Sequence, residues 1–501
     1  MTDSFPRQSA RTRRFTLGAP RDLQVSADGR RVVFLRSRAG DDPVTCLWVA
    51  DVHTGEERLV ADPRALLDVA PADPTRDRTG GDDPPADDLP AQERRQRERR
   101  REAASGITSY ATDARGTVCA FALAGRLFVA GLLSGTARPL PVAGPVFDPR
   151  PDPPARRVAY VSGRVLCIGE LDGSWRVLAG GDLDEPDTVS WGSADFIAAE
   201  EMHRFRGYWW SPDGQAIAVC RVDVEPVGVW HLSDPADPTE PATPIRYPAA
   251  GTANADVSLH VFDIDGGEPV DVEWDRARLP YLADAEWSVA GLIITVQSRD
   301  QRTLEVRRVD PATGATDLLF DDHDPDWVEL VPGSPRLLAD GRLVVCADRG
   351  GARRLLVDSE PVTDPELQVR SIVTVDDQRV VFTANPIDDP TVAHVWSWRD
   401  DTGCEPLTDD EGVHGAAAGG PTVVLRSATL DHPGSRWVLP DGVELTSHAE
   451  VPVVSPNVTI SRTDSGMPVA VLLPRDHEGS PLPVLLDPYG GPHAQRVVRT
   501  H

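Results

Sequence analysis

The chain has 501 residues, more than one compact domain usually holds, and its 46 prolines and 41 glycines exclude a helical bundle. Its 79 acidic residues outnumber its 51 basic residues, which are all arginine, and the net charge of −28 argues against nucleic acid as the main partner. No apolar run approaches the ~20 residues of a membrane-spanning helix, so no membrane partner is expected and the acidic balance fits a cytoplasmic protein.

Short β-type runs alternate with tight turns from about residue 24 to residue 455. Asp-Gly recurs in these turns, because glycine accepts the positive φ that a tight hairpin turn requires. A second turn, in which Asp is followed by Thr-Gly, closes other pairs of runs, as at Asp401-Thr402-Gly403. The clearest predicted strands are 31–35, 117–122, 216–220 and 343–346.

This repetition of strands and turns predicts an all-β fold. A propeller blade of about four strands takes roughly 40–50 residues, so the span 24–455 has room for seven or eight blades with insertions. We therefore predict a β-propeller, with an array of β-sandwiches as the competing interpretation.

Two segments interrupt the strand pattern. Residues 63–91 are rich in Pro, Asp and Gly and predict a flexible insert, which extends to residue 105. Within that insert, the Arg/Glu-rich run 92–102 is a strong helix former, and residues 198–205 also have helix propensity.

The pattern changes again after about residue 456. Residues 467–474 and the fully apolar run 483–487 predict two strands, and a Gly-rich turn follows the second. A buried strand that ends in such a turn is typical of the opening of an α/β domain, and about 45 residues are too few to complete one. We therefore expect three parts, which are an N-terminal segment 1–23, a propeller 24–455 and an incomplete α/β domain 456–501.

Glu200 and Glu201 are adjacent carboxylates, which repel each other unless a cation lies between them. A free α-ammonium group, with its three N–H donors, suits that position. The alternative is local, because Arg204 stands four residues after Glu200 and three after Glu201, the spacing of ordinary ion pairs on a helix.

Two further features carry candidate chemistry. An arginine of the run 92–102 suits a carbonyl or carboxylate of a ligand, although such runs also form solvated helices held by their own ion pairs. Tyr489 follows a predicted strand and either donates a hydrogen bond to an oxyanion or packs in its turn.

Other site types have no support in the sequence. The acidic run 321–326 matches no calcium loop, and no phosphate-binding or dinucleotide-binding glycine motif occurs, so we expect no metal and no cofactor. The Gly-x-Ser-x-Gly motif of a hydrolase nucleophile is also absent from the 501 residues.

Four stretches together resemble a known family. They are EEMHRFRGYWWSP at 200–212, RYPAAGTAN at 246–254, RERRR at 97–101 before GITSY at 106–110, and DPYGGP at 487–492. These stretches resemble the dipeptidyl peptidase IV family of serine peptidases, within the prolyl oligopeptidase clan. The arginine-rich stretch is similar to the cytosolic dipeptidyl peptidase 8 and 9 branch and to bacterial relatives, and the last stretch is similar to the start of the family's hydrolase domain.

The resemblance implies an eight-bladed propeller followed by an α/β-hydrolase domain, in an enzyme that releases N-terminal dipeptides, usually after Pro or Ala. Glu200 and Glu201 match the glutamate pair that holds the ammonium group of the substrate. Arg101 matches the arginine that contacts the substrate carbonyl, with Arg100 as the neighbouring alternative. Tyr489 matches the tyrosine whose hydroxyl stabilises the oxyanion.

The family's catalytic serine, aspartate and histidine lie on the hydrolase domain, beyond the last residue of this chain. We therefore expect a fragment of a serine-type dipeptidyl peptidase that does not hydrolyse peptides alone, and we assign no catalytic role to His501. The expected partners are peptides with free N-termini, with a homodimer for the full-length protein. The alternative is a non-catalytic propeller that binds peptide N-termini or a protein partner, because a fold does not fix a function.

Overall fold

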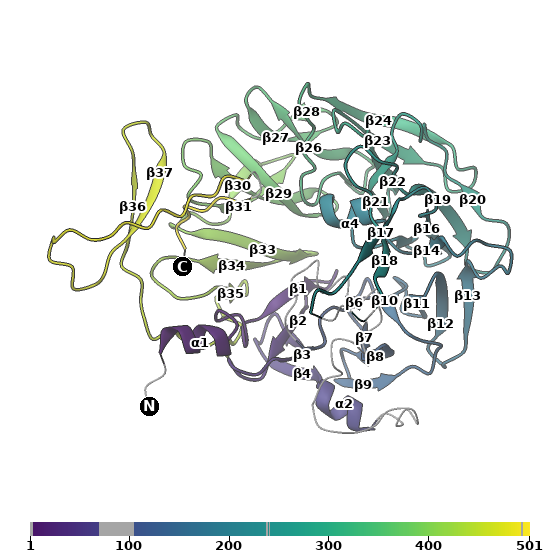
Figure 1. Cartoon of the computed structure of the whole chain (residues 1–501), viewed down its shortest axis with the longest axis horizontal. Coiled ribbons are helices and arrows are strands. Elements are labelled where there is room, and N and C mark those ends of the chain that lie inside the picture. The colour runs from purple at the N-terminus through teal and green to yellow at the C-terminus, as the bar shows by residue number, and fades with distance from the viewer. Residues whose placement is uncertain (1–3, 70–104, 237–238, 240, 492–493, 501) are drawn as a thin grey trace. The chain divides into compact units, whose positions relative to one another are not determined.

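The computed structural model describes residues 4–69, 105–236, 239, 241–491 and 494–500 (Figure 1). The chain forms two compact units, which are treated separately below. The terminal unit consists of residues 1–59, 331–338 and 342–501, and the middle unit consists of residues 60–330 and 339–341.

Within the described ranges, eight antiparallel sheets make up most of the regular structure. The first three contain β1 (Arg21–Val25), β2 (Arg31–Ser37), β3 (Val44–Asp51) and β4 (Glu57–Ala61); β6 (Ala111–Thr112), β7 (Val118–Leu123), β8 (Arg126–Gly131) and β9 (Thr136–Pro139); and β10 (Phe147–Pro151), β11 (Arg157–Ser162), β12 (Val165–Glu170) and β13 (Trp175–Ala179). The fourth contains β14 (Val189–Trp191), β15 (Tyr208–Trp210), β16 (Ala216–Asp223), β19 (Asp256–Asp263) and β20 (Val270–Asp271).

The remaining four sheets follow the same up-and-down order. They contain β21 (Tyr281–Ser288), β22 (Gly291–Gln297), β23 (Thr303–Val309) and β24 (Thr316–His323); β25 (Arg336–Leu337), β26 (Leu343–Arg349), β27 (Ala352–Val357) and β28 (Glu360–Pro361); β29 (Leu367–Val375), β30 (Arg379–Pro386), β31 (His394–Arg399) and β32 (Gly403–Pro406); and β33 (Val413–Gly419), β34 (Thr422–Ala428) and β35 (Arg436–Val438).

A few described elements lie outside these eight sheets. They are the helices α1 (Phe5–Arg11), α2 (Pro63–Val69) and α4 (Phe196–Glu201), the hairpin of β17 (Val229–Leu232) with β18 (Thr243–Arg246), and the hairpin of β36 (Val458–Arg462) with β37 (Pro468–Leu472). The short β5 (Ser105–Gly106) belongs to the first sheet.

The predicted fold class is confirmed. The sheets are the eight blades of a β-propeller, and the four strands singled out from the sequence are β2, β7, β16 and β26. Their central positions are buried on both faces, as in β2, where six of seven residues are buried. Val32 and Phe34 of β2, for example, pack in one cluster with Val424 of β34.

The Asp-Gly turns are held by their own side chains. In the turn before β16, Asp213 accepts hydrogen bonds from the Ser211 hydroxyl at 2.6 Å and from the Gln215 N–H at 3.0 Å, and Gly214 has a φ of +68°. The hydrogen bond from Ser211 is the main influence that holds the pKa of Asp213 below its usual range. The carboxylate therefore stabilises the turn that the Asp-Gly signal predicted.

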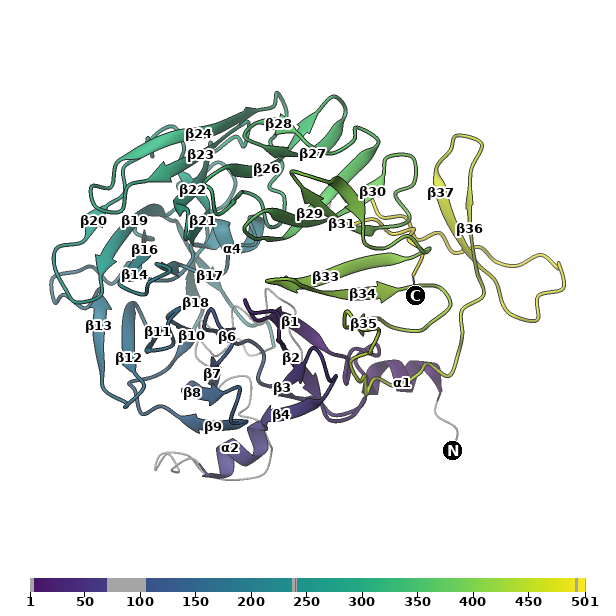
Figure 2. The ribbon, with the colours of Figure 1, turned by 180° about the vertical axis from the view of Figure 1, so that it is seen from behind.

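Within the terminal unit, the first and last blades meet. β1 lies beside β33 in the views of both Figure 1 and Figure 2, and the two strands are in contact. The Thr422 hydroxyl donates a hydrogen bond to the Gly29 carbonyl at 2.8 Å, which joins positions 393 residues apart in the chain. The meeting of these two blades is therefore held by side-chain contacts as well as by strand packing.

Two local predictions were wrong. Residues 483–487 form no strand, and Val484, Leu485 and Leu486 are 82%, 92% and 81% exposed, because no described strand pairs with them. The helix predicted over 198–205 is instead α4, which ends at Glu201. The predicted helix 92–102 lies outside the described residues, and the predicted boundaries at residues 23 and 455 stay predictions.

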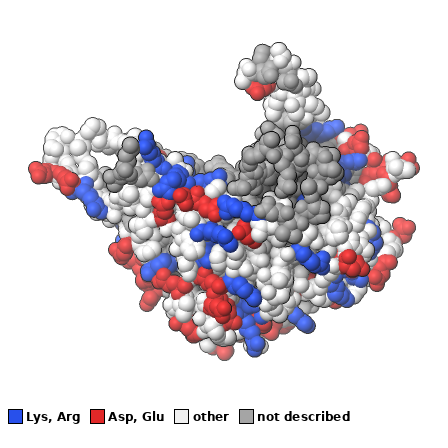
Figure 3. Space-filling model, turned by 90° about the horizontal axis from the view of Figure 1, so that it is seen from below, with Lys and Arg blue, Asp and Glu red and all other residues white. Residues whose placement is uncertain are grey.

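On the face that Figure 3 shows, acidic and basic side chains are interspersed rather than gathered by sign. Many arginines pair with carboxylates, as Arg342 does with Asp400 and Arg157 with Glu170. No helix among the described residues combines the length and the apolar character needed to cross a bilayer.

We expect the stability of the protein to fall between pH 7.5 and pH 5.5. Burial lowers the pKa of His260 below its ordinary value of 6.5, so the unfolded chain takes up a proton in a range where the folded chain does not. Protonation therefore favours the unfolded chain as the pH falls. Thermal melting at pH 7.5 and pH 5.5 measures this. The thermal midpoint should change less between the two pH values for His260→Gln than for the wild type, and an equal change in both proteins would contradict the expectation.

Candidate functional site

The predicted glutamate pair lies at the C-terminal end of α4, in the middle unit. α4 begins after Asp195, whose Oδ2 accepts a hydrogen bond from the Ala198 N–H at 3.1 Å, so Asp195 is an ordinary N-cap. Glu200 and Glu201 are the last two helical residues, and both are exposed. The helix thus presents two carboxylates to solvent at its carbonyl end, where the helix dipole favours a cation.

The local pairing considered for these glutamates is not formed, because Arg204 lies beyond the end of α4. Its guanidinium donates hydrogen bonds to Asp195 Oδ1 at 3.1 Å, to the Leu282 carbonyl at 3.1 Å and to the Arg206 carbonyl at 2.9 Å. The Arg204 guanidinium therefore makes these hydrogen bonds in the interior of the protein instead of pairing with the glutamates. Among the described residues, none forms a hydrogen bond or ion pair with the Glu201 side chain.

The backbone after α4 turns sharply to bring Arg204 inward. His203 has a φ of +55°, a left-handed conformation that is uncommon for a residue with a side chain. Gly207 follows at a position where a Cβ atom would lie 2.5 Å from the backbone of Gly192 and Ser193. Only glycine fits this close approach, which explains the Gly before the aromatic strand β15.

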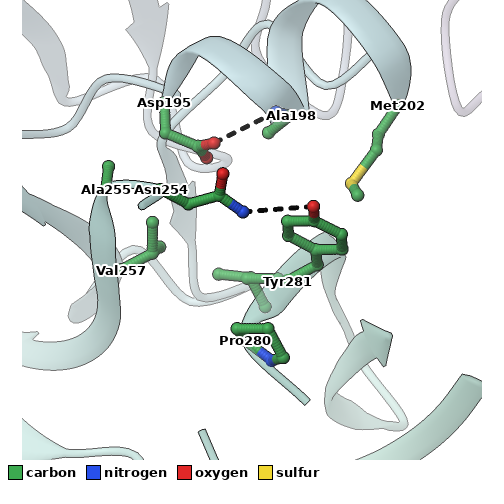
Figure 4. A pocket seen from close by; sticks show the side chains of 9 residues that line it. Asp195, Ala198, Met202, Asn254, Ala255, Val257, Pro280 and Tyr281 are labelled. Atoms are coloured by element: carbon green, nitrogen blue, oxygen red, sulfur yellow. Dashed lines mark hydrogen bonds between the residues drawn. The ribbon is translucent and has the colours of Figure 1, made fainter. Parts of the chain in front are cut away.

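A small hollow lies beside α4, as Figure 4 shows. The Asn254 side-chain amide donates a hydrogen bond to the Tyr281 hydroxyl at 3.1 Å, and Met202 lines the same hollow at the end of α4. On α4 itself, Phe196 makes an edge contact with Tyr247, with ring centroids 5.4 Å apart. Asn254 and Tyr247 belong to the 246–254 stretch recognised in the sequence, so that stretch packs around the glutamate helix.

Arg206 is a second partly buried arginine near the site. It donates from Nε and Nη2 to the Tyr208 carbonyl, and its guanidinium lies over the Trp209 ring at 5.5 Å. Burial lowers the pKa of Arg206 to about 10, with the Arg150 cation adding to the effect. None of its hydrogen bonds reaches α4, so its role is in the packing of β15.

The structure brings together two of the four predicted site residues. Glu200 and Glu201 lie side by side, whereas Arg101 is outside the described residues. Tyr489 belongs to the terminal unit, is 40% exposed and has its hydroxyl against Gly491. The roles of Arg101 and Tyr489 stay predictions.

The sequence does not reveal the ion pair of Asp195 and Arg204 beside the glutamate helix. They lie nine residues apart and meet only because the chain reverses at His203, so no helical or strand spacing reveals the pair. The only signal in the sequence was Asp195 itself, because Asp is a residue type preferred at the N-cap of a helix. Among the described residues, no group of three or more His, Cys, Asp or Glu side chains is placed to hold a metal ion.

Known proteins resemble this chain in sequence. Probable dipeptidyl-aminopeptidase B of Aspergillus niger is 25% identical over 332 residues, which cover 57% of this chain and 36% of that protein. Probable dipeptidyl peptidase 4 of Aspergillus flavus is 24% identical over 404 residues, covering 69% of this chain and 50% of that protein. Dipeptidyl peptidase 8 of Mus musculus is 30% identical over 130 residues, covering 21% of this chain and 14% of that protein. The chain thus spans at most about half the length of these relatives.

Structural and family comparisons agree with these similarities. The crystal structure of Porphyromonas gingivalis dipeptidyl peptidase 4 has a TM-score of 0.73 at 17% identity, over 97% of this chain and 69% of that one, and so has the same fold. The family model of the dipeptidyl peptidase IV (DPP IV) N-terminal region matches residues 118–434, which is more than half of the chain and includes the glutamate pair. The chain therefore belongs to the dipeptidyl peptidase IV family, through the N-terminal region of that family.

Proposed function

We propose that this chain is the substrate-gating propeller of a serine-type dipeptidyl peptidase, and that Glu200 and Glu201 bind the free N-terminal ammonium group of the peptide. The observation that carries the proposal is the pair of exposed carboxylates at the end of a short helix in a chain of this family. A protonated amine between them relieves their mutual repulsion and supplies three N–H donors.

This chemistry accounts for the release of dipeptides. An exopeptidase must measure a fixed distance from the free amine to the bond that it cleaves. A carboxylate pair does this because an acetylated N-terminus has no charge to offer, so its binding desolvates the two carboxylates without supplying a cation. The same pair would therefore select both the free amine and the position of the cleaved bond.

Arg101 and Tyr489 carry two further proposed roles. Arg101 would direct its planar guanidinium at a substrate carbonyl, a geometry that a single lysine ammonium does not offer. Tyr489 would donate its hydroxyl proton in a hydrogen bond to the oxyanion that forms when the peptide carbonyl is attacked. Both assignments rest on the family resemblance and are tested by substitution in the full peptidase.

The test of the proposed function is a calorimetric titration of the 501-residue protein with Val-Pro amide and with its N-acetyl derivative. The free amine is expected to bind, and the acetylated peptide is expected to bind at least about tenfold more weakly, because it cannot form the charge-assisted hydrogen bonds. Equal affinity for the two ligands would contradict the proposal.

We also expect no hydrolysis of a Gly-Pro reporter by the 501-residue protein. The 501 residues contain no Gly-x-Ser-x-Gly motif, so binding is expected without turnover. A fluorogenic assay with a serine-directed inhibitor as control measures this. Inhibitor-sensitive release of product by pure protein would show that a nucleophile is present and would overturn this part of the proposal.

A further inference from the structure

The ion pair of Asp195 and Arg204 lies directly behind the glutamate helix. The two side chains are 11% and 2% exposed, and Arg204 Nη2 lies 3.1 Å from Asp195 Oδ1. We infer that this buried pair is a positioning device, which fixes α4 and thereby sets the affinity of Glu200 and Glu201 for an amine. The inference rests on the proposed function of the glutamates.

Arg204 is anchored on the propeller side by several contacts at once. Its guanidinium donates to the Leu282 carbonyl on β21 and to the Arg206 carbonyl just before β15, and it also contacts the Cys220 sulfur on β16 at 3.7 Å. These acceptors lie on or next to three strands of the middle unit, so the guanidinium cannot move without breaking contacts to each of them. Arg204 is therefore a fixed point relative to the blades.

Asp195 connects this fixed point to the helix. One carboxylate oxygen, Oδ1, accepts from Arg204, and the other, Oδ2, accepts from the Ala198 N–H in the first turn of α4. The Arg204 backbone N–H donates to the Ala198 carbonyl at 2.9 Å, which closes the end of the helix onto the same residue. A single carboxylate therefore holds the helix and is itself held by the buried arginine.

Besides the ion pair, α4 is held by the contact of Phe196 with Tyr247. It has six residues, and helices this short are unstable in isolation because nucleation is unfavourable. Its buried residues are Ala198 and Ala199, whose side chains offer little surface to pack. The orientation of the two glutamates therefore depends on how the Asp195–Arg204 pair holds the start and the end of the helix.

Three variants separate positioning from general stability. Asp195→Asn keeps the ability to cap the helix, because Asn is as good an N-cap as Asp, but it removes the charge that Arg204 binds. Arg204→Leu removes the guanidinium. Arg206→Leu is the matched control, because it removes a partly buried arginine two residues away whose hydrogen bonds do not reach α4.

The protein offers a direct spectroscopic reading of the helix. It has three methionines, Met1, Met202 and Met467, and of these Met202 is the residue at the C-terminal end of α4, beside Tyr281 in the hollow of Figure 4. Labelling the methionine methyl groups with ¹³C gives three signals, and a change in the position of α4 relative to the Tyr281 ring shifts the Met202 signal. Leucine replacements add no further methionine signal.

We expect Asp195→Asn and Arg204→Leu each to weaken binding of Val-Pro amide by about tenfold or more and to shift the Met202 signal, because misplacing a binding group by about 1 Å is enough to lose such a factor. Arg206→Leu is expected to lower the thermal midpoint while leaving the affinity and the Met202 signal unchanged. Arg204→Lys is expected to restore binding only in part, because an ammonium lacks the planar fork.

The outcomes distinguish this inference from the proposed function. If Glu200→Gln and Glu201→Gln weaken amine binding but Asp195→Asn and Arg204→Leu do not, the positioning role is wrong and the proposed function stands. If the two glutamate variants bind the amine as the wild type does, the proposed function itself is wrong. An equal loss of affinity in Arg206→Leu would show that the effect is one of general stability and would also overturn the inference.

Discussion

The double replacement of Glu200 and Glu201 by glutamine is expected to weaken binding of Val-Pro amide by about a hundredfold, because each charge-assisted hydrogen bond contributes about 1.5–3 kcal/mol. The single variants are each expected to lose about tenfold. Glutamine keeps the size of the side chain and a carbonyl acceptor, so the loss reports the negative charge. Calorimetric titration of the three variants beside the wild type measures it.

Two controls accompany these variants. Glu268→Gln changes an exposed glutamate elsewhere in the middle unit and is expected to leave the affinity unchanged, which excludes a general effect of net charge. The N-acetyl peptide should bind the double variant and the wild type alike. Wild-type affinity for the free amine in the double variant would remove the basis of the proposed site.

Replacing Gly420 by alanine is expected to lower the free energy of unfolding by about 3–4 kcal/mol. Gly420 has a φ of +50°, which strains any residue with a side chain, and a Cβ there would lie 2.3 Å from the Ala27 carbonyl oxygen. This contact joins the turn between β33 and β34 to the turn between β1 and β2, so the substitution pushes the last blade away from the first. Urea unfolding followed by tryptophan fluorescence measures the change.

Gly434→Ala is the matched control for backbone strain. Gly434 has a φ of +76° in the same unit, but no atom lies within 4 Å of the position its Cβ would occupy. Its replacement should therefore show the cost of the left-handed conformation alone, about 1–2 kcal/mol. Equal destabilisation by the two variants would contradict the view that the blade contact at Gly420 stabilises the fold.

The blade architecture could be predicted from the sequence because its signals are local. An Asp-Gly turn needs only residues adjacent in the chain, as Ser211, Asp213 and Gln215 show, and a blade is made of consecutive strands. The prediction of the number of blades depended on the number of residues per blade and on the family resemblance. The prediction of a strand over 483–487 was wrong because apolar character alone does not supply a pairing partner.

The candidate site was predictable only in part. The glutamates could be recognised because they are adjacent and lie in a specific motif. Helical spacing suggested Arg204 as their partner, but α4 ends at Glu201, and the left-handed turn at His203 directs Arg204 to Asp195 instead. A contact of this kind depends on where the helix stops, which propensity fixes only to within a few residues.

The measurement that tests the central claim most directly is an experimental structure of the 501-residue protein soaked with Val-Pro amide. Our account predicts the peptide nitrogen within about 3 Å of carboxylate oxygens from both Glu200 and Glu201, with α4 still held by the Asp195–Arg204 pair. A peptide that binds with its amine away from both glutamates would contradict the account.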